Sequence, residues 1–253
     1  MFSKAIVKTP CPEMISGISS AQLGKPDYPK ALEQHQAYIT ALEHCGLEVW
    51  VLEPDSAFPD SCFVEDTALV TPNCAIITNP GAASRKGETK AIAEALTTFY
   101  PNLLFIEAPG TLDAGDMMMV GNHFYIGLSE RTNQEGARQM ISHLEVNGQS
   151  GSTVAMNEML HLKTGVSYLE YNNLVVTGEM VTKPAFDAFN KIIVAKDEAY
   201  AANCIWVNDN VLLPAGRPKA RAAIEQAGYQ VIPLDTSEFE KLDGGLSCLS
   251  LRF

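Results

Sequence analysis

The sequence lacks the features that mark secreted, zinc-binding and membrane proteins. Its 6 cysteines form no C-x-x-C pair and no Cys/His set at zinc-ligand spacing, which argues against a structural zinc site. No stretch approaches the roughly 18 apolar residues of a membrane span, and the N-terminal segment has no signal-peptide core. We therefore expect a cytoplasmic protein with reduced thiols and no membrane partner.

Positive charge is also scarce, with 18 Lys and Arg against 30 Asp and Glu and a formal net charge of −12. This balance disfavours nucleic acid as a partner but allows a cationic small molecule as a ligand. Phosphate-binding glycine motifs are absent, since no G-x-G-x-x-G occurs and Gly24-Lys25 lacks the upstream glycine of a Walker motif. At 253 residues and 46% apolar composition, the chain can bury a large core in one domain or two.

Four pairs of short apolar runs are separated by asparagine-containing turns, which is typical of β-hairpins. A stretch with helical periodicity follows each pair, and a further apolar run comes after it. The hairpin runs are 62–70 with 75–78, 117–120 with 124–127, 166–171 with 174–177, and 205–207 with 211–214. The helical stretches are 87–100, 133–147, 184–190 and 217–227, and the last runs are 103–107, 152–156, 192–195 and 230–234.

This pattern is a ββαβ unit that recurs four times. The two chain ends supply a fifth unit if 247–253 pairs with 4–7, followed by a helix over 28–45 and a strand over 47–52. One such unit cannot bury its apolar face alone, so repeats of this length favour a ring of units. We therefore predict a pseudo-symmetric five-bladed α/β-propeller in one domain (1–253), closed by pairing of the N- and C-terminal strands. The alternative is an ordinary mixed α/β domain without rotational symmetry.

Reactive side chains lie at matching places, near the start of the first hairpin strand of different units. They include Asp66, Asp113, His161 and Cys248. Rotation about a common axis would bring them together as a thiol, an imidazole and carboxylates, the components of a nucleophilic site. Most cysteines serve packing, but Cys248 lies between a glycine-rich segment and a strand, which favours a functional thiol.

Seven motifs in order resemble those of the dimethylarginine dimethylaminohydrolase family, in the guanidino-group-modifying (pentein) superfamily. They are LGKPD at 23–27, FPDSCFVED at 58–66, LDAGD at 112–116, RTN at 131–133, LHLK at 160–163, AANC at 201–204 and DGGLSC at 243–248. The resemblance extends over nearly the whole chain, and it implies the five-bladed propeller fold.

The resemblance also implies roles for individual residues. Cys248 would be the nucleophile, His161 the general acid and base, and Asp113 the carboxylate that orients the imidazole. Some relatives have a glutamate at the place of Asp113, so the distance from this shorter side chain to His161 is left open. The implied substrate-binding residues are Asp60, Glu65 and Asp66 at the cationic end, Arg85 and Arg131 for the amino-acid carboxylate, Ile18 in a lid and Leu242 before the cysteine loop.

The implied activity is hydrolysis of Nω-methylated arginines to citrulline and methylamines through a covalent thiouronium on the cysteine. This reaction uses a small-molecule substrate and needs no metal or organic cofactor, and a homodimer is possible. An arginine deiminase acting on free arginine is one alternative, although that group has Arg-Asp in place of Glu65-Asp66. A non-catalytic propeller that only binds partners is an alternative from another class.

Overall fold

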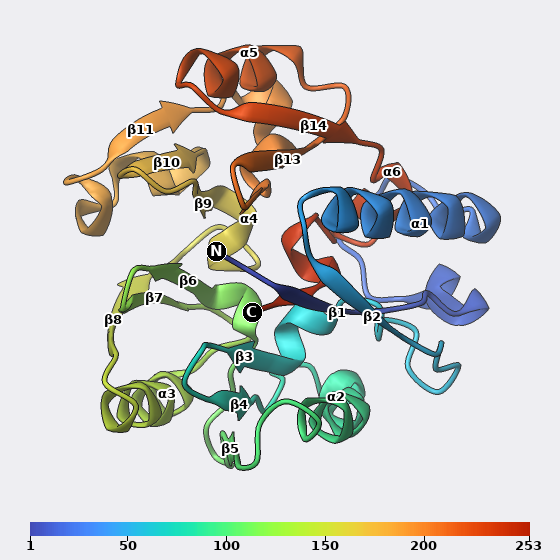
Figure 1. Cartoon of the computed structure of the whole chain (residues 1–253), viewed down its shortest axis with the longest axis vertical. Coiled ribbons are helices and arrows are strands. Elements are labelled where there is room, and N and C mark those ends of the chain that lie inside the picture. Colours follow the sequence, from blue (N-terminus) through green and yellow to red (C-terminus); the bar gives the residue numbers. More distant parts are fainter.

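The computed structural model describes residues 1–253 and contains five three-stranded sheets (Figure 1). In each sheet the middle strand pairs antiparallel with one neighbour and parallel with the other. The antiparallel partner is joined by a tight turn in four of the sheets, whereas the parallel partner requires a crossover. The predicted ββαβ pattern is therefore present, with one exception described below.

Four structural units, each built around one three-stranded sheet, follow one another along the chain. The first contains β3 (Ala68–Val70), β4 (Ala75–Ile77), α2 (Thr89–Leu96) and β5 (Leu103–Phe105). The second contains β6 (Met117–Val120), β7 (His123–Leu128), α3 (Gln134–Val146) and β8 (Ser150–Ala155). The third, after the short helix α4 (Leu162–Gly165), contains β9 (Val166–Tyr168), β10 (Asn173–Val176) and β11 (Asn190–Ile193). The fourth contains β12 (Ile205–Val207), β13 (Asn210–Pro214), α5 (Pro218–Gln226) and β14 (Gln230–Leu234), and α6 (Ser237–Glu240) follows it.

The fifth sheet joins the two ends of the chain. Strand β1 (Lys4–Lys8) pairs antiparallel with β15 (Leu251–Arg252), with Ala5 opposite Arg252, and parallel with β2 (Glu48–Leu52). The predicted pairing of the terminal strands is thus confirmed. Figure 1 shows both termini near the middle of the molecule, with the other four sheets around them. Side chains from different sheets can therefore meet near this centre.

Helices α1 (Tyr28–His44), α2, α3 and α5 cover the outside of their sheets (Figure 1). Asp27 caps the N-terminus of helix α1, where its side chain accepts from the backbone N–H of Lys30. A proline lies in the first turn of the helix. Its inner face buries Tyr38 and Leu42 completely in the largest apolar cluster. Burial of each such side chain contributes about 1.5–3 kcal/mol relative to exposure. None of the helices is both long and apolar enough to cross a membrane.

Two local predictions were wrong. The expected helix over 184–190 is only a short 3-10 turn, η6 (Pro184–Phe186), because strand β11 begins at Asn190 and leaves room for fewer than two helical turns. The expected strand over 62–70 starts only at Ala68, since η2 (Val64–Thr67) is a 3-10 turn whose residues are all buried. The second difference determines where the adjacent acids of η2 point.

Candidate active site

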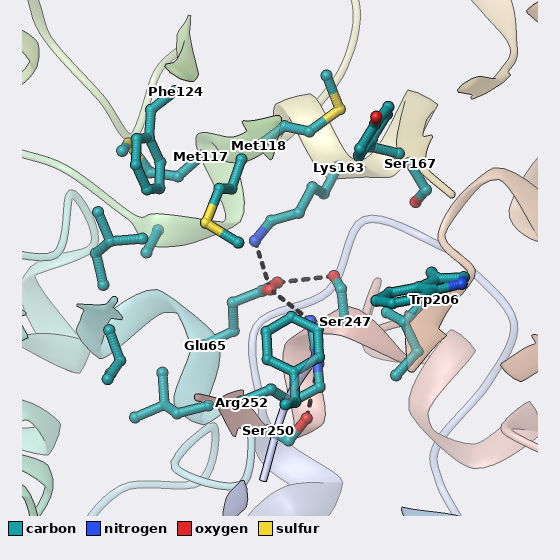
Figure 2. A pocket seen from close by; sticks show the side chains of 18 of the residues that line it. Glu65, Met117, Met118, Phe124, Lys163, Ser167, Trp206, Ser247, Ser250 and Arg252 are labelled. Atoms are coloured by element: carbon teal, nitrogen blue, oxygen red, sulfur yellow. Dashed lines mark hydrogen bonds and ion pairs between the residues drawn. The ribbon is translucent and has the colours of Figure 1, made fainter. Parts of the chain in front are cut away.

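Nine of the ten residues expected in the site line one cavity of about 140 Å³. Glu65 is the exception, although its neighbour Asp66 lines this cavity. The carboxylate of Glu65 lines a second cavity of about 150 Å³, where it contacts Lys163 and Ser247 (Figure 2). The η2 turn thus directs successive side chains into different cavities, and the contact of Glu65 with the substrate stays a prediction. The cavity that contains the other nine is called the catalytic cavity below.

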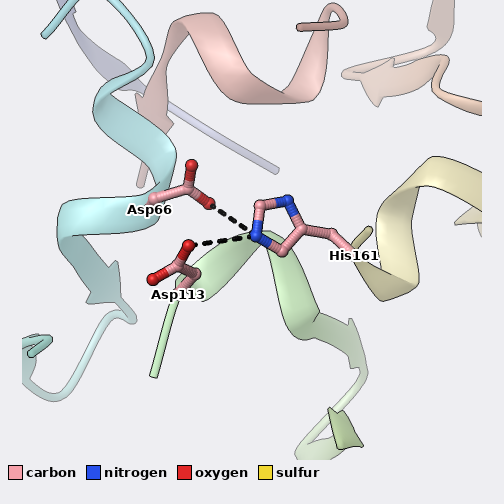
Figure 3. Close-up of side chains that lie close together, drawn as sticks. All are labelled: Asp66, Asp113 and His161. Atoms are coloured by element: carbon pink, nitrogen blue, oxygen red, sulfur yellow. Dashed lines mark hydrogen bonds and ion pairs between the residues drawn. The ribbon is translucent and has the colours of Figure 1, made fainter. Parts of the chain in front are cut away.

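His161 and Asp113 form a direct pair in the catalytic cavity (Figure 3). Nε2 of His161 lies 3.1 Å from Oδ2 of Asp113, so the aspartate is long enough to reach the imidazole. The other carboxylate oxygen of Asp113 accepts from the backbone N–H of Gly81 at 2.8 Å, which fixes the orientation of the carboxylate. Asp113 can therefore orient the ring and leave Nδ1 for the reacting atoms.

Asp66 is a second buried carboxylate beside the same imidazole, with Oδ1 at 4.0 Å from Nε2 of His161 (Figure 3). Its Oδ1 accepts from the backbone N–H of Gly115 at 3.0 Å. A Cβ atom at position 115 would lie 2.6 Å from this oxygen and 3.0 Å from Nδ1 of His161. Glycine is therefore required at position 115 for the carboxylate and the imidazole to approach each other.

These charges set the protonation of the imidazole. Burial alone would lower the pKa of His161, but the charge of Asp66, the hydrogen bond to Asp113 and the charge of Asp116 outweigh it and raise the pKa to about 9. Burial would likewise raise the pKa of Asp66, but the charges of His161 and Arg85 hold it below its usual value. At neutral pH the site thus contains an imidazolium, which can act as a general acid.

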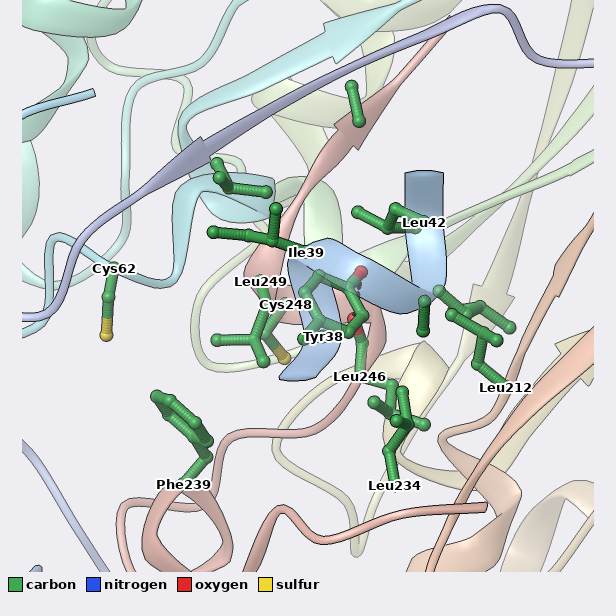
Figure 4. Close-up of a cluster of buried hydrophobic side chains, with 14 of the residues drawn as sticks. Tyr38, Ile39, Leu42, Cys62, Leu212, Leu234, Phe239, Leu246, Cys248 and Leu249 are labelled. Carbon is green, nitrogen blue, oxygen red and sulfur yellow. Dashed lines mark hydrogen bonds between the residues drawn. The ribbon is translucent and has the colours of Figure 1, made fainter. Parts of the chain in front are cut away.

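Cys248 lies in the 3-10 turn η8 (Ser247–Leu249), among the apolar side chains of Tyr38, Ile39 and Leu249 (Figure 4). Its Sγ accepts from the backbone N–H of Gly245 at 3.3 Å. Burial, followed by the negative charges of Glu65 and Asp66, raises the pKa of this thiol to about 12. The resting group is therefore a neutral thiol, which a nearby cation would help to ionise.

The two arginines of the cavity differ in their contacts. The guanidinium of Arg85 is buried and donates to Asp66, to Glu88 and to the carbonyl oxygen of Phe63, which leaves one N–H of Nη1 without a protein acceptor. The side chain of Arg131 forms no ion pair or hydrogen bond with the protein. Arg131 is thus the cation with donors free for a ligand carboxylate, whereas Arg85 mainly holds Asp66.

A loop after η1 (Pro12–Ser16) covers the catalytic cavity. The backbone N–H of Ile18 donates to the carboxylate of Asp60 at 3.0 Å. The backbone N–H and the hydroxyl of Ser20 both donate to Asp243, which precedes the cysteine loop. The side chain of Leu242 is buried beside this loop and also lines the cavity. The loop that contains Ile18, the residue expected in a lid, is therefore attached to both walls of the site.

Two residues with clear structural roles were not singled out from the sequence. Asp116 is fully buried, and its carboxylate accepts from the backbone N–H of Leu162 at 2.9 Å and from the hydroxyl of Ser129 at 2.6 Å. It therefore fixes the backbone directly after His161. Asp243 binds the loop at Ser20 as described above. The sequence signal for Asp116 is its place as the second acid of the LDAGD motif.

The side chains of Asp66, Asp113 and His161 also come within 4.8 Å of one another, a spacing at which they could surround a cation. A metal ligand must be a neutral imidazole. The raised pKa of His161, about 9, favours the protonated ring at neutral pH, and Arg85 already neutralises Asp66. These residues therefore fit proton transfer to a ligand better than metal coordination.

Comparison with known proteins gives matches over the whole chain. A family model described as N,N dimethylarginine dimethylhydrolase, eukaryotic, matches residues 24–184. An N(G),N(G)-dimethylarginine dimethylaminohydrolase from Pseudomonas aeruginosa is 58% identical over 100% of both chains, and one from Streptomyces coelicolor is 34% identical over 98% of this chain and 96% of the relative.

Comparison with solved structures also gives matches over the whole chain. A cysteine-to-serine variant of the Pseudomonas aeruginosa protein, complexed with citrulline, superposes with a TM-score of 0.99 and 100% coverage of both chains at 58% identity. The N-terminal domain of ArgZ, a cyanobacterial arginine dihydrolase, superposes with a TM-score of 0.86 at 18% identity, over 98% of this chain and 97% of that one. The second likeness concerns the fold alone.

Proposed function

The chain belongs to the dimethylarginine dimethylaminohydrolase family, and on that premise we propose that it hydrolyses Nω-methylated arginines with Cys248 as nucleophile and His161 as general acid and base. The enzyme is a hydrolase that acts on carbon–nitrogen bonds of linear amidines and releases citrulline and a methylamine. The observation that carries the assignment of residues is that Cys248, the His161–Asp113 pair and Asp66 line the same small cavity.

Substrate binding uses the two ends of this cavity. Asp66 faces the guanidinium, with Asp60 as a further carboxylate at the wall. Arg131, whose donors are free, binds the amino-acid carboxylate in the bidentate geometry that a guanidinium favours. Arg85 acts mainly through Asp66 and contributes at most its one free N–H. The loop at Ile18 covers the bound amino acid.

The first half of the reaction forms a covalent intermediate. The bound guanidinium favours loss of the Cys248 proton to solvent, because a cation offsets the negative charges that raise the pKa of this thiol. The thiolate attacks the central guanidinium carbon and gives a tetrahedral centre. Its carbon–nitrogen bond to the methylated nitrogen breaks as His161 donates a proton, so the methylamine leaves and a thiouronium remains on Cys248.

The second half uses His161 in its deprotonated form. The neutral imidazole accepts a proton from water, and the resulting hydroxide equivalent attacks the thiouronium carbon. The carbon–sulfur bond then breaks, which restores the cysteine and gives citrulline. Asp113 holds Nε2 throughout, so the same Nδ1 atom serves first as acid and then as base. Neither step requires a metal or an organic cofactor.

The arrangement of the five sheets supports a closed five-bladed propeller as the architecture. The pairing of β1 with β15 joins the chain ends within one sheet, and the site residues come from loops that meet near the centre of Figure 1. A cytoplasmic location is supported by six cysteines that form no disulfide. A homodimer is supported by the exposed apolar residues Trp50 and Val51 on β2, at the edge of its sheet.

A side-by-side assay of citrulline release from asymmetric dimethylarginine, monomethylarginine and arginine tests the proposed function. We expect release from the methylated substrates with a higher kcat/KM than from arginine. Comparable kcat/KM values on arginine would favour the deiminase alternative, and no citrulline from any substrate would favour a non-catalytic binding protein.

A further inference from the structure

The second cavity, which Glu65 lines, has no role in the proposed reaction. Its volume of about 150 Å³ is close to that of the catalytic cavity, and its apolar walls come from β3, β6, β7 and β12. The polar residues Glu65, Lys163, Ser247 and Arg252 form a cluster at one side of it (Figure 2). A cavity of this size with apolar walls and a few polar groups is typical of a small-molecule site.

The charges of this cluster favour an anion. The one carboxylate, Glu65, contacts two cations: the ammonium group of Lys163 and, at 4.0 Å, the guanidinium of Arg252. The side chains of the two cations are only 17% and 13% exposed. Within this cluster the two cations thus exceed the one carboxylate by one positive charge, in a partly buried place. The other acid of the cavity, Glu170, lies on the turn between β9 and β10, next to the exposed Tyr171.

The hydrogen-bond donors of this cluster also favour an anion as its ligand. An ammonium has three donors and a guanidinium five. Lys163 donates only to Glu65, and Arg252 donates only to the hydroxyl of Ser250 at 2.7 Å. Nε of Arg252 is buried and has no partner. A buried donor without an acceptor costs about 1–3 kcal/mol, so an acceptor group at this place would be stabilising.

We propose that this cavity is a second binding site, for a small carboxylic acid with a short apolar chain or ring. Its carboxylate accepts from Lys163 and Arg252, and its apolar part packs against Met118, Phe124 and Trp206. A carboxylate supplies the missing negative charge and several acceptor positions at once. The site differs from the substrate site in position and in chemistry, since it lacks the acids that face a guanidinium there.

The second site is connected to the nucleophile through Glu65. One oxygen of Glu65 contacts Lys163, and the other accepts from the hydroxyl of Ser247 at 2.7 Å, directly before Cys248. A bound carboxylate would draw Lys163 and Arg252 away from Glu65 and add a negative charge nearby. Both effects disfavour the thiolate of Cys248. Alkylation of Cys248 at a fixed pH should therefore slow when the site is filled.

Trp206 lines this cavity, so its fluorescence reports binding in a Trp50→Phe protein, where it is the one remaining tryptophan. We would titrate this protein with phenylacetate, and with phenylacetamide and phenethylamine as neutral and cationic probes of similar shape. The expected result is a saturable change in emission with phenylacetate and a weaker or absent one with the other two probes. No saturation with phenylacetate up to about 10 mM, or tighter binding of the amine, would overturn the proposal.

Two arginine variants form a matched pair that locates the ligand. Arg252→Met should weaken phenylacetate binding about tenfold or more, because a charge-assisted hydrogen bond is lost. Arg131→Met removes a guanidinium from the catalytic cavity and should leave this binding unchanged. The opposite pattern would show that phenylacetate binds in the catalytic cavity. If circular dichroism shows that Arg252→Met does not fold, Val70→Phe, which fills the cavity without a change in charge, should abolish binding, and retained binding would refute the site.

Discussion

Oδ2 of Asp113 lies 3.1 Å from Nε2 of His161, within hydrogen-bond distance despite the short aspartate side chain. The backbone N–H of Gly81 donates to the other carboxylate oxygen, so the orientation of Asp113 does not depend on the imidazole alone. This pair keeps a protonated imidazole in the cavity that also contains the buried thiol of Cys248.

Replacement of Asp113 by asparagine should lower the pKa of His161 from about 9, because the charge and the hydrogen-bond acceptor at Nε2 are both weakened. The kcat should fall by a factor on the order of 10² or more, the usual contribution of a positioned acid–base group. NMR titration of the imidazole C–H signals measures the pKa directly. Asp113→Glu serves as the control that retains the charge, and an unchanged pKa in Asp113→Asn would contradict the assigned pairing.

The same pair makes folding stability depend on pH. The folded-state pKa of His161, about 9, exceeds its ordinary value of 6.5, so the stabilisation is fully present below pH 6.5 and is lost as the pH rises through about 9. The difference in free energy of unfolding between the wild type and Asp113→Asn should therefore be largest near pH 6 and shrink toward pH 9. Urea unfolding at several pH values measures this difference, and a gap that widens with pH would refute the assignment.

The ionisation of Cys248 should depend on the substrate cation. Without ligand, the alkylation rate should keep rising with pH well beyond 9, since the pKa of the thiol is raised to about 12. A non-reactive guanidinium ligand that leaves the sulfur accessible should shift this profile to lower pH. Iodoacetamide labelling followed by mass spectrometry measures the rate. The same low apparent pKa with and without ligand would exclude ionisation assisted by the substrate.

Substitution of the consecutive acids Glu65 and Asp66 should change the kinetics of the enzyme in different ways. Asp66→Asn should lower kcat/KM by a factor of about 10² or more, because the carboxylate faces the guanidinium. Glu65→Gln should leave KM nearly unchanged and lower the pKa of Cys248, since it removes one of the charges that raise it. Steady-state kinetics with dimethylarginine separates the two variants. A large rise in KM for Glu65→Gln would restore the direct substrate contact that the sequence predicted.

These two acids show how far the sequence could predict the site. The repeat period predicted the unit pattern and the pairing of the chain ends, and the family resemblance implied the nine residues that line one cavity. The direction of Glu65 could not be predicted, because the resemblance implied that both adjacent acids face the substrate, and the 3-10 turn η2 was not expected there. The helix over 184–190 was wrong for a similar reason, since periodicity over seven residues cannot separate a helix from a 3-10 turn that begins with proline.

Asp60 should contribute to binding more than to chemistry, because its carboxylate accepts from the backbone N–H of Ile18 in the covering loop. Asp60→Asn should raise KM for dimethylarginine by a factor of about 5–50 with a smaller effect on kcat. Ile18→Leu is a control in the same loop and should change KM by less than about threefold, since the two side chains are nearly isosteric. Steady-state kinetics tests both variants, and a larger effect of Ile18→Leu than of Asp60→Asn would contradict this role.

The proposed mechanism requires that Cys248 bonds covalently to the guanidinium carbon and that His161 donates a proton to the leaving amine. Mass spectrometry of the peptide that contains Cys248, after acid quench of the wild-type enzyme during turnover of dimethylarginine, detects this intermediate. We expect a mass increase on Cys248 that corresponds to the thiouronium in the wild type, a much smaller one in His161→Gly, and neither adduct nor citrulline from Cys248→Ser. Citrulline release by Cys248→Ser, or an adduct on another residue, would contradict it.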